Sequence, residues 1–218
     1  MRIRLAALAA ALLGFAAVPV VSAPSAVAAP ATAKVYVMPV TASGHAAPGF
    51  RVHAQHLGFG ISCDYKNPSP GAVSPNIEEC SPSAAYAIAC WKAAAPGKVL
   101  CLRNPRGHKL DKVKRAGKFA NTPIAKPRDR APLLIVLTDG SRCMIRDGGA
   151  WGQPKGHPNL YGAYSCDKYG AAWLRAKGSH SDPHNGVDES SPTWRIRVGE
   201  KNVVWRNIAT AYFVATAA

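Results

Sequence analysis

Residues 133–146 read Leu-Leu-Ile-Val-Leu-Thr-Asp-Gly-Ser-Arg-Cys-Met-Ile-Arg, which is the pattern of two β-strands joined by a tight turn. Asp139-Gly140 suits a two-residue hairpin turn, because both residues of that turn take positive φ. With Thr138 opposite Ser141, four apolar side chains share one face, namely Leu134, Val136, Cys143 and Ile145. The outgoing strand is apolar on both faces, so we expect it in the middle of a sheet.

A second hairpin is predicted upstream, where residues 84–91 and 98–103 both alternate with the period of a strand and Ala-Ala-Pro-Gly lies between them. Pairing Cys90 with Cys101 gives one register that satisfies both faces. Ile88 and Val99 then join the cysteine face, and the opposite face carries Trp91, Leu100 and Leu102. This register predicts a disulfide between the two strands.

The chain has six cysteines, an even number that predicts three disulfides in an oxidising compartment. Fifteen pairings are possible in principle, but the local patterns favour one of them. Cys90 pairs with Cys101 in the hairpin register, Cys143 points inward and meets Cys166, and Cys63 is left for Cys80. No Cys-x-x-Cys pair occurs, which argues against a thioredoxin-like redox site and a four-cysteine zinc site.

The remaining strand signals lie near the two ends of the chain. Residues 34–38 form a plausible strand, and residues 193–198 alternate with Trp194, Ile196 and Val198 inward. Residues 199–202 are turn material, residues 203–205 return, and residues 208–214 fit either a last strand or a short helix. No helix-period segment of twelve or more residues follows residue 33. The predicted fold class is therefore mainly β, a small disulfide-stabilised antiparallel sheet or sandwich of hairpins with little helix.

The first residues have the build of a secretory signal peptide. Arg2 and Arg4 precede an uncharged run over residues 5–18, which is shorter than the roughly 20 residues of a membrane-spanning helix. Small residues allow cleavage after Ala23, Ala28 or Ala33, and Pro24 disfavours the first of these. We expect residues 1–33 to contain a signal cut after Ala28 or Ala33, followed by a single secreted β-rich disulfide domain over residues 34–218 without a transmembrane segment. The predicted localisation is extracellular or associated with the cell envelope.

Positive charge is concentrated in one segment. Without Arg2 and Arg4 the chain has 25 basic residues against 12 acidic ones, and residues 98–130 hold eleven of the basic residues against Asp111 and Asp129. We interpret this segment as an exposed loop or ribbon that attracts an anionic polymer or a membrane surface. The predicted binding residues are Arg106, Lys109, Lys112, Lys114, Arg115 and Lys118. The alternative interpretation is a solvated surface that only confers solubility.

Other chemistry has weaker signals. Phe119 is the only aromatic residue in the basic segment, which argues against sequence-specific nucleic-acid binding. His180, Asp182 and His184 alternate as metal ligands can, but they lie in a turn-rich loop, and neither a metal nor a cofactor is predicted.

Two alternative functions remain open. One is a secreted hydrolase using a pair of a histidine and a carboxylate, although no known catalytic motif occurs. Its candidate residues are His45, His53, His56, His108 and His157 with Glu78, Glu79, Asp147 and Asp188. The other is a protease inhibitor that presents the loop 147–162, a Gly- and Pro-rich segment with Trp151 and Tyr161 between Cys143 and Cys166.

Several short motifs together resemble exported actinobacterial proteins of unknown function. They are Ala-Cys-Trp at 89–91, Cys-Leu-Arg-Asn-Pro at 101–105, Asp-Gly-Ser-Arg-Cys at 139–143, Ile-Arg-Asp-Gly-Gly-Ala at 145–150, Tyr-Ser-Cys at 164–166, Trp-Arg-Ile-Arg-Val at 194–198 and Ala-Tyr-Phe at 211–213. The resemblance covers about residues 60–215. It implies export and disulfides, and it supplies no catalytic residues.

Overall fold

The computed structural model describes residues 29–55, 59–82, 87–146, 152–177 and 180–218. Its strands are β1 (Ala33–Thr41), β2 (Arg51–Ala54), β3 (Ile61–Ser62), β4 (Cys90–Lys92), β5 (Lys98–Leu102), β6 (Lys109–Ala116), β7 (Leu134–Leu137), β8 (Arg142–Ile145), β9 (Leu160–Cys166), β10 (Gly170–Lys177), β11 (His180–Ser181), β12 (Arg195–Val198) and β13 (Val204–Ala217). Two short 3-10 segments, Pro127–Asp129 and Pro183–Gly186, complete the regular structure. The fold is mainly β, as predicted. Among the described residues, no helix has the length and apolar character needed to cross a membrane.

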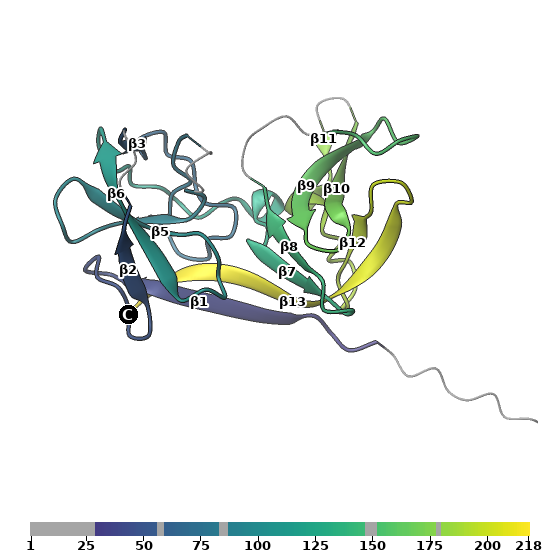
Figure 1. Cartoon of the computed structure of the whole chain (residues 1–218), viewed down its shortest axis with the longest axis horizontal. Helices are drawn as coiled ribbons and strands as arrows, with labels where there is room; N and C mark the ends of the chain where they lie inside the picture. Colours follow the sequence, from purple (N-terminus) through teal and green to yellow (C-terminus); the bar gives the residue numbers. More distant parts are fainter. Residues whose placement is uncertain (1–28, 56–58, 83–86, 147–151, 178–179) are drawn as a thin grey trace, which may run out of the picture.

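The strands form two lobes (Figure 1). In the larger lobe, a closed ring of hydrogen-bonded strands runs β7-β8-β9-β10-β12-β13 and returns to β7. All pairings in this ring are antiparallel. The strand that contains residues 134–137 is therefore flanked on both edges, as its apolar faces predicted.

The smaller lobe is a five-stranded sheet in the order β2-β6-β5-β4, with β3 also paired to β6. β4, β5 and β6 are antiparallel neighbours, whereas β2 and β3 both pair with β6 in parallel. The parallel pairings join segments far apart in the chain, and no turn signal in the sequence indicated them.

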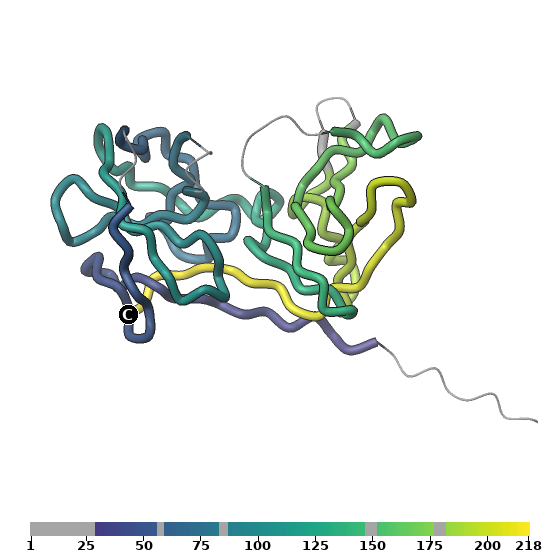
Figure 2. The backbone as a smooth tube through the Cα atoms, viewed as in Figure 1, coloured from purple at the N-terminus to yellow at the C-terminus, as the bar shows by residue number. Residues whose placement is uncertain are grey.

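A long pair of strands connects the lobes. β1 and β13 run side by side in parallel beneath both lobes, and the C-terminus lies under the smaller one (Figure 2). The main hydrophobic core extends across the junction, since Leu100, Leu102 and Leu110 of the smaller lobe belong to the same buried cluster as Leu133 and Ile135 of the larger one. β13 settles the open question about residues 208–214, which are strand.

All three predicted cysteine pairs are disulfides in the structure: Cys63–Cys80, Cys90–Cys101 and Cys143–Cys166. The first two lie in a second, smaller buried cluster with Ile61, Val99 and Val113, and the third lies in the main core. Cys90 is opposite Cys101 in the β4–β5 register, and Cys143 is opposite Cys166 between β8 and β9. Two of the three bridges therefore join neighbouring strands, one in each lobe.

The register predicted for the hairpin at 133–146 is wrong by one residue. Ile135, and not Val136, lies opposite Cys143. The turn has three residues, because the amide of Leu137 donates to the carbonyl of Ser141 and Gly140 takes a left-handed conformation with φ of 82°. Leu134 and Ile135 are both buried, so the core accommodates either face of this strand.

The prediction for residues 84–91 is also wrong in extent. The strand there begins only at Cys90, and residues 83–86 lie outside the described part of the chain. Ile88 packs in the main core instead of joining the cysteine face. The rest of that face assignment is confirmed, because Val99 lies with the cysteines whereas Trp91 and Leu100 face the main core.

Candidate functional site

The six predicted binding residues do not form one exposed loop or ribbon, which corrects that expectation. Residues 109–116 are β6, the central strand of the smaller lobe, so successive side chains point to opposite faces. Lys112 and Lys114 share one face, and Lys109 and Arg115 lie on the other. Arg106 lines a groove of about 520 Å³ between the lobes, and Lys118 follows the strand.

One face of this sheet nevertheless gathers lysines. Lys98 of β5 lies directly opposite Lys114 of β6, and Lys112 is the next residue of β6 on the same face. Lys114 is exposed, and the other two side chains are partly buried. We call Lys98, Lys112 and Lys114 the lysine face. In the part of the chain that the structure describes, none of the three forms an ion pair.

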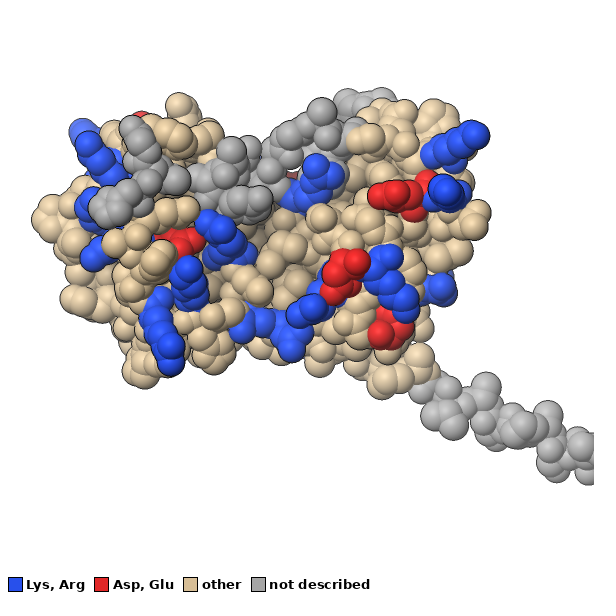
Figure 3. Space-filling model, in the orientation of Figure 1, with Lys and Arg blue, Asp and Glu red and all other residues tan. Residues whose placement is uncertain are grey.

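A second pair of like charges lies on the opposite face of β6, where Arg51 of β2 is the register partner of Lys109. Like charges at directly opposed positions destabilise a sheet. One acid lies nearby, since Asp111 is buried and its carboxylate is 3.3 Å from a guanidinium nitrogen of Arg103. Asp111 lies on the face of β6 that carries Lys109, opposite the lysine face. Figure 3 shows Lys and Arg side chains gathered over the smaller lobe and along the region between the lobes, with few acids among them.

The alternating residues His180, Asp182 and His184 have other contacts where the structure describes their side chains. The side chain of His180 lies outside the described residues, and Asp182 is committed to an ion pair of 2.7 Å with Arg197. Nδ1 of His184 is 3.0 Å from the carbonyl oxygen of Arg130. The described residues contain no group of three or more potential metal-ligating side chains.

His184 instead meets a carboxylate that the sequence did not single out. Its Nδ1 is 3.7 Å from Oε1 of Glu189, and both side chains are about three-quarters buried. They line a pocket of about 240 Å³ together with Lys34, Arg130 and Trp194, which come from separate parts of the chain. We call this the His184 pocket. Burial raises the pKa of Glu189, and the charges of His184, Lys34 and Arg130 oppose that rise.

Two grooves of about 500 Å³ and 510 Å³ meet at Arg197 and Trp205. The guanidinium carbons of Arg197 and Arg195 lie 4.4 Å and 4.7 Å from the centre of a Trp205 ring, which is cation–π geometry. Arg195 also pairs with Asp188 at 2.8 Å, and Arg197 pairs with Asp182. Hydrogen bonds from Ser190 and Arg195 lower the pKa of Asp188 to about 2. These arginines are thus neutralised locally, unlike the lysine face.

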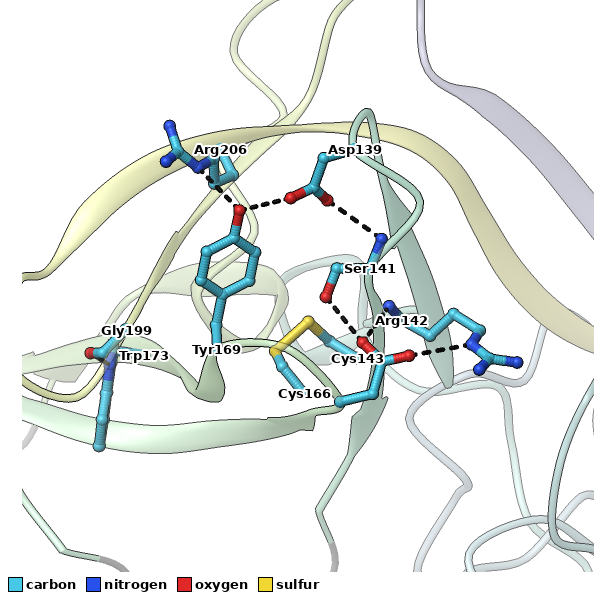
Figure 4. Close-up of a disulfide and its surroundings, with 10 residues drawn as sticks. Asp139, Ser141, Arg142, Cys143, Cys166, Tyr169, Trp173, Gly199 and Arg206 are labelled. Atoms are coloured by element: carbon cyan, nitrogen blue, oxygen red, sulfur yellow. Dashed lines mark hydrogen bonds and ion pairs between the residues drawn. A yellow bond between two sulfur atoms is a disulfide. The ribbon is translucent and has the colours of Figure 1, made fainter.

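A polar network surrounds the Asp139-Gly140 turn between β7 and β8, in the closed ring of strands of the larger lobe (Figure 4). Asp139 accepts hydrogen bonds from the hydroxyl of Tyr169, from Lys168 and from the amide of Ser141. Asp167 accepts hydrogen bonds from the amide and the guanidinium of Arg142 and from the hydroxyl of Ser141. These bonds hold the pKa of both carboxyls below the usual value. Both acids therefore stay ionised and fix the turn.

Glu78, one of the carboxylates considered for a hydrolase, is completely buried in the smaller lobe. The hydroxyl of Thr122 donates to its Oε1, and Oε2 has no hydrogen-bond partner among the described residues. Burial raises its pKa to about 7, although a backbone hydrogen bond from Asn67 lowers it. A carboxyl without access to solvent has no substrate to act on, so Glu78 is better placed to affect stability than catalysis.

The predicted inhibitor loop 147–162 is only partly described. Residues 147–151, including Trp151, lie outside the described residues, and so does His56 of the hydrolase candidates. Tyr161, at the start of β9, is 41% exposed. No protein-family model, curated protein or solved structure matches this chain. Its function therefore has to be argued from its own geometry.

Proposed function

We propose that this protein is exported and binds a partner with repeated negative charges, either an acidic polymer of the cell envelope or a layer of anionic lipid headgroups. The observation that carries the proposal is the lysine face, where Lys98 lies opposite Lys114 with Lys112 beside them. Three cations held this closely by a rigid sheet repel one another. Contact with an anionic surface would relieve this repulsion and release counterions.

Export is supported by the three disulfides, which form in an oxidising compartment. The alternative of a hydrolase has gained one supporting contact, the pair His184–Glu189, but that contact alone specifies no reaction. The inhibitor alternative has gained none among the described residues of the 147–162 loop. Binding through the lysine face therefore remains the better-supported function.

Replacing Lys98, Lys112 and Lys114 together by Gln should weaken binding to a heparin column and to vesicles that contain anionic lipid. We expect the wild type to elute from heparin above about 0.3 M salt, and the slope of log K against log salt to fall by about one for each lysine that makes a contact. Retention on heparin alone would indicate a polymer, and retention on vesicles alone would indicate lipid.

The matched control is the triple variant K92Q/K155Q/K201Q, which removes the same charge from exposed positions outside the lysine face. It should elute close to the wild type. If both triple variants shift elution equally, the protein responds only to net charge, and the proposal for a lysine face is wrong.

The hydrogen bonds of Thr32 support cleavage after Ala28 over cleavage after Ala33. The Thr32 hydroxyl donates to the carbonyl oxygen of Ile208 at 2.6 Å and accepts from the amide of Trp194 at 2.8 Å. The amide of Thr32 donates to the carbonyl of Pro192. Cleavage after Ala33 would remove these bonds from a buried position, whereas cleavage after Ala28 would keep them.

We therefore expect the exported protein to begin at Ala29, which mass spectrometry of its N-terminal peptide would show. A chain that starts at Lys34 should be less stable in urea than one that starts at Ala29, by about 1–3 kcal/mol for the lost hydrogen bonds. An exported product that begins at Lys34, or equal stability of the two chains, would contradict this assignment.

A further inference from the structure

The His184 pocket has features of a ligand site that binding through the lysine face does not use. Six segments meet there: β1, the segment at Val73, the segment 127–130, the segment 183–189, Trp194 just before β12, and β13. The lysine face lies on β5 and β6, outside these segments. The volume of the His184 pocket, about 240 Å³, is below the range typical of pockets for drug-sized ligands, so the pocket suits a small molecule.

The charges in the pocket favour an anion. Lys34 and Arg130 line it against one acid, Glu189. The Nε of Arg130 is buried and has no hydrogen-bond partner among the described residues, whereas its Nη2 donates to the carbonyl of Ala125 at 3.3 Å. A guanidinium that lines a pocket is a natural partner for a carboxylate or phosphate oxygen.

The wall of the pocket is aromatic. Trp194 and Phe213 meet edge to face with ring centres 6.4 Å apart, and Tyr36 lies 5.9 Å from Phe213. Nζ of Lys34 is 4.6 Å from the centre of the Trp194 ring, so the cation and the aromatic surface are adjacent. Such a wall suits a planar apolar group attached to the anion.

The backbone at His184 is held in an unusual conformation. His184 and the next residue, Asn185, have φ of 52° and 54°, which non-glycine residues seldom adopt. Hydrogen bonds fix both side chains, because Nδ1 of His184 meets the carbonyl of Arg130 and the Asn185 amide donates to the carbonyl of Ala163. A carbonyl only accepts, so Nδ1 carries a proton, which leaves Nε2 as the second polar atom of the ring. Strain of this kind is typical of functional sites.

We propose that the His184 pocket binds a small organic anion, one planar ring bearing a carboxylate or a phosphate group. Lys34 and the guanidinium of Arg130 bind the anionic group, and the ring packs on Trp194 and Phe213. Glu189 holds His184 in place and, as the one acid in the pocket, weakens anion binding.

Calorimetric titration of the full protein with benzoate and with phenyl phosphate tests this inference. We expect saturable binding of at least one of them, and at least tenfold weaker binding of acetate, inorganic phosphate and the neutral analogue benzamide. The variant K34Q should weaken binding about fivefold or more, whereas E189Q should strengthen it. The control K201Q, at an exposed lysine outside the pocket, should bind as the wild type does.

Absence of saturable binding of either aromatic anion at millimolar concentration would overturn the proposal. Equal binding of benzamide would overturn the role of charge, and so would loss of binding in E189Q with an unchanged thermal unfolding midpoint. The triple variant of the lysine face should bind both aromatic anions normally, so failure here and failure of the proposed function are separable.

Discussion

Replacing Glu78 by Gln will stabilise the fold at pH 8 by up to about 3 kcal/mol and will change its stability little at pH 4. The completely buried Glu78 carboxyl has a pKa of about 7 in the folded protein, against 4.5 as the usual value. The folded state therefore holds a proton that the unfolded state releases above pH 4.5. The contribution of the protonated Glu78 to the stability of the fold is complete below pH 4.5 and is lost as the pH rises through about 7. Gln carries no charge at any of these pH values, so it removes this loss.

The measurement is urea unfolding of the wild type and E78Q at several pH values from 4 to 8. The two free-energy curves should meet at low pH and diverge as the pH increases. E200Q makes the same substitution at an exposed glutamate and should give a curve parallel to the wild type. If the E78Q curve is also parallel, Glu78 ionises in the folded protein as it does in the unfolded chain.

Removing the Cys143–Cys166 bridge by the double substitution C143A/C166A will destabilise the protein by about 3 kcal/mol or more. The bridge closes a loop with a sequence separation of 23, and both residues lie in the main core. Loss of the bridge increases the conformational entropy of the unfolded chain, and loss of two buried sulfur atoms removes packing. We expect a lower urea midpoint with a fold that is retained at low temperature.

The double variant C63A/C80A provides the comparison, because its bridge has a separation of 17 but lies in the smaller buried cluster. It should lose a similar entropic contribution and less from the main core. A loss below about 1 kcal/mol in C143A/C166A would mean that the bridge does not constrain the unfolded chain as the entropic treatment requires.

Local patterns predicted part of the antiparallel fold, but they missed the strands β6, β9 and β10. Alternation in residues 193–198 correctly placed Trp194, Ile196 and Val198 inside, since polar residues separate them. The same principle failed to fix the register at residues 134–137, because a strand that is apolar on both faces fits the core in either register. At this strand the turn sets the register. The turn is fixed by hydrogen bonds of Ser141 to Asp139 and Leu137, which the alternation of apolar residues does not indicate.

The candidate site was predictable only where its residues are neighbours in the sequence. Lys112 and Lys114 belong to a basic segment that is visible in the sequence. They lie on the opposite face from Lys109 because residues 109–116 form the strand β6. The sequence did not indicate this strand, whose partners include the distant parallel strands β2 and β3. The His184 pocket brings Lys34, Arg130 and Glu189 together from three distant segments. Nothing in their local spacing indicates that convergence.

The pairing of β1 with β13 also bears on the order in which the protein forms. Ala33 is the register partner of Thr210, and β13 supplies an edge to β7 and β12 as well. A chain that leaves a ribosome or a translocation channel from its N-terminus therefore cannot close the barrel until its last strand has emerged. Until then β1 lacks its strand partner and β7 lacks a partner along one edge, and contacts between such distant residues form slowly. The pairing of the two ends of the chain thus makes completion of the fold wait for β13.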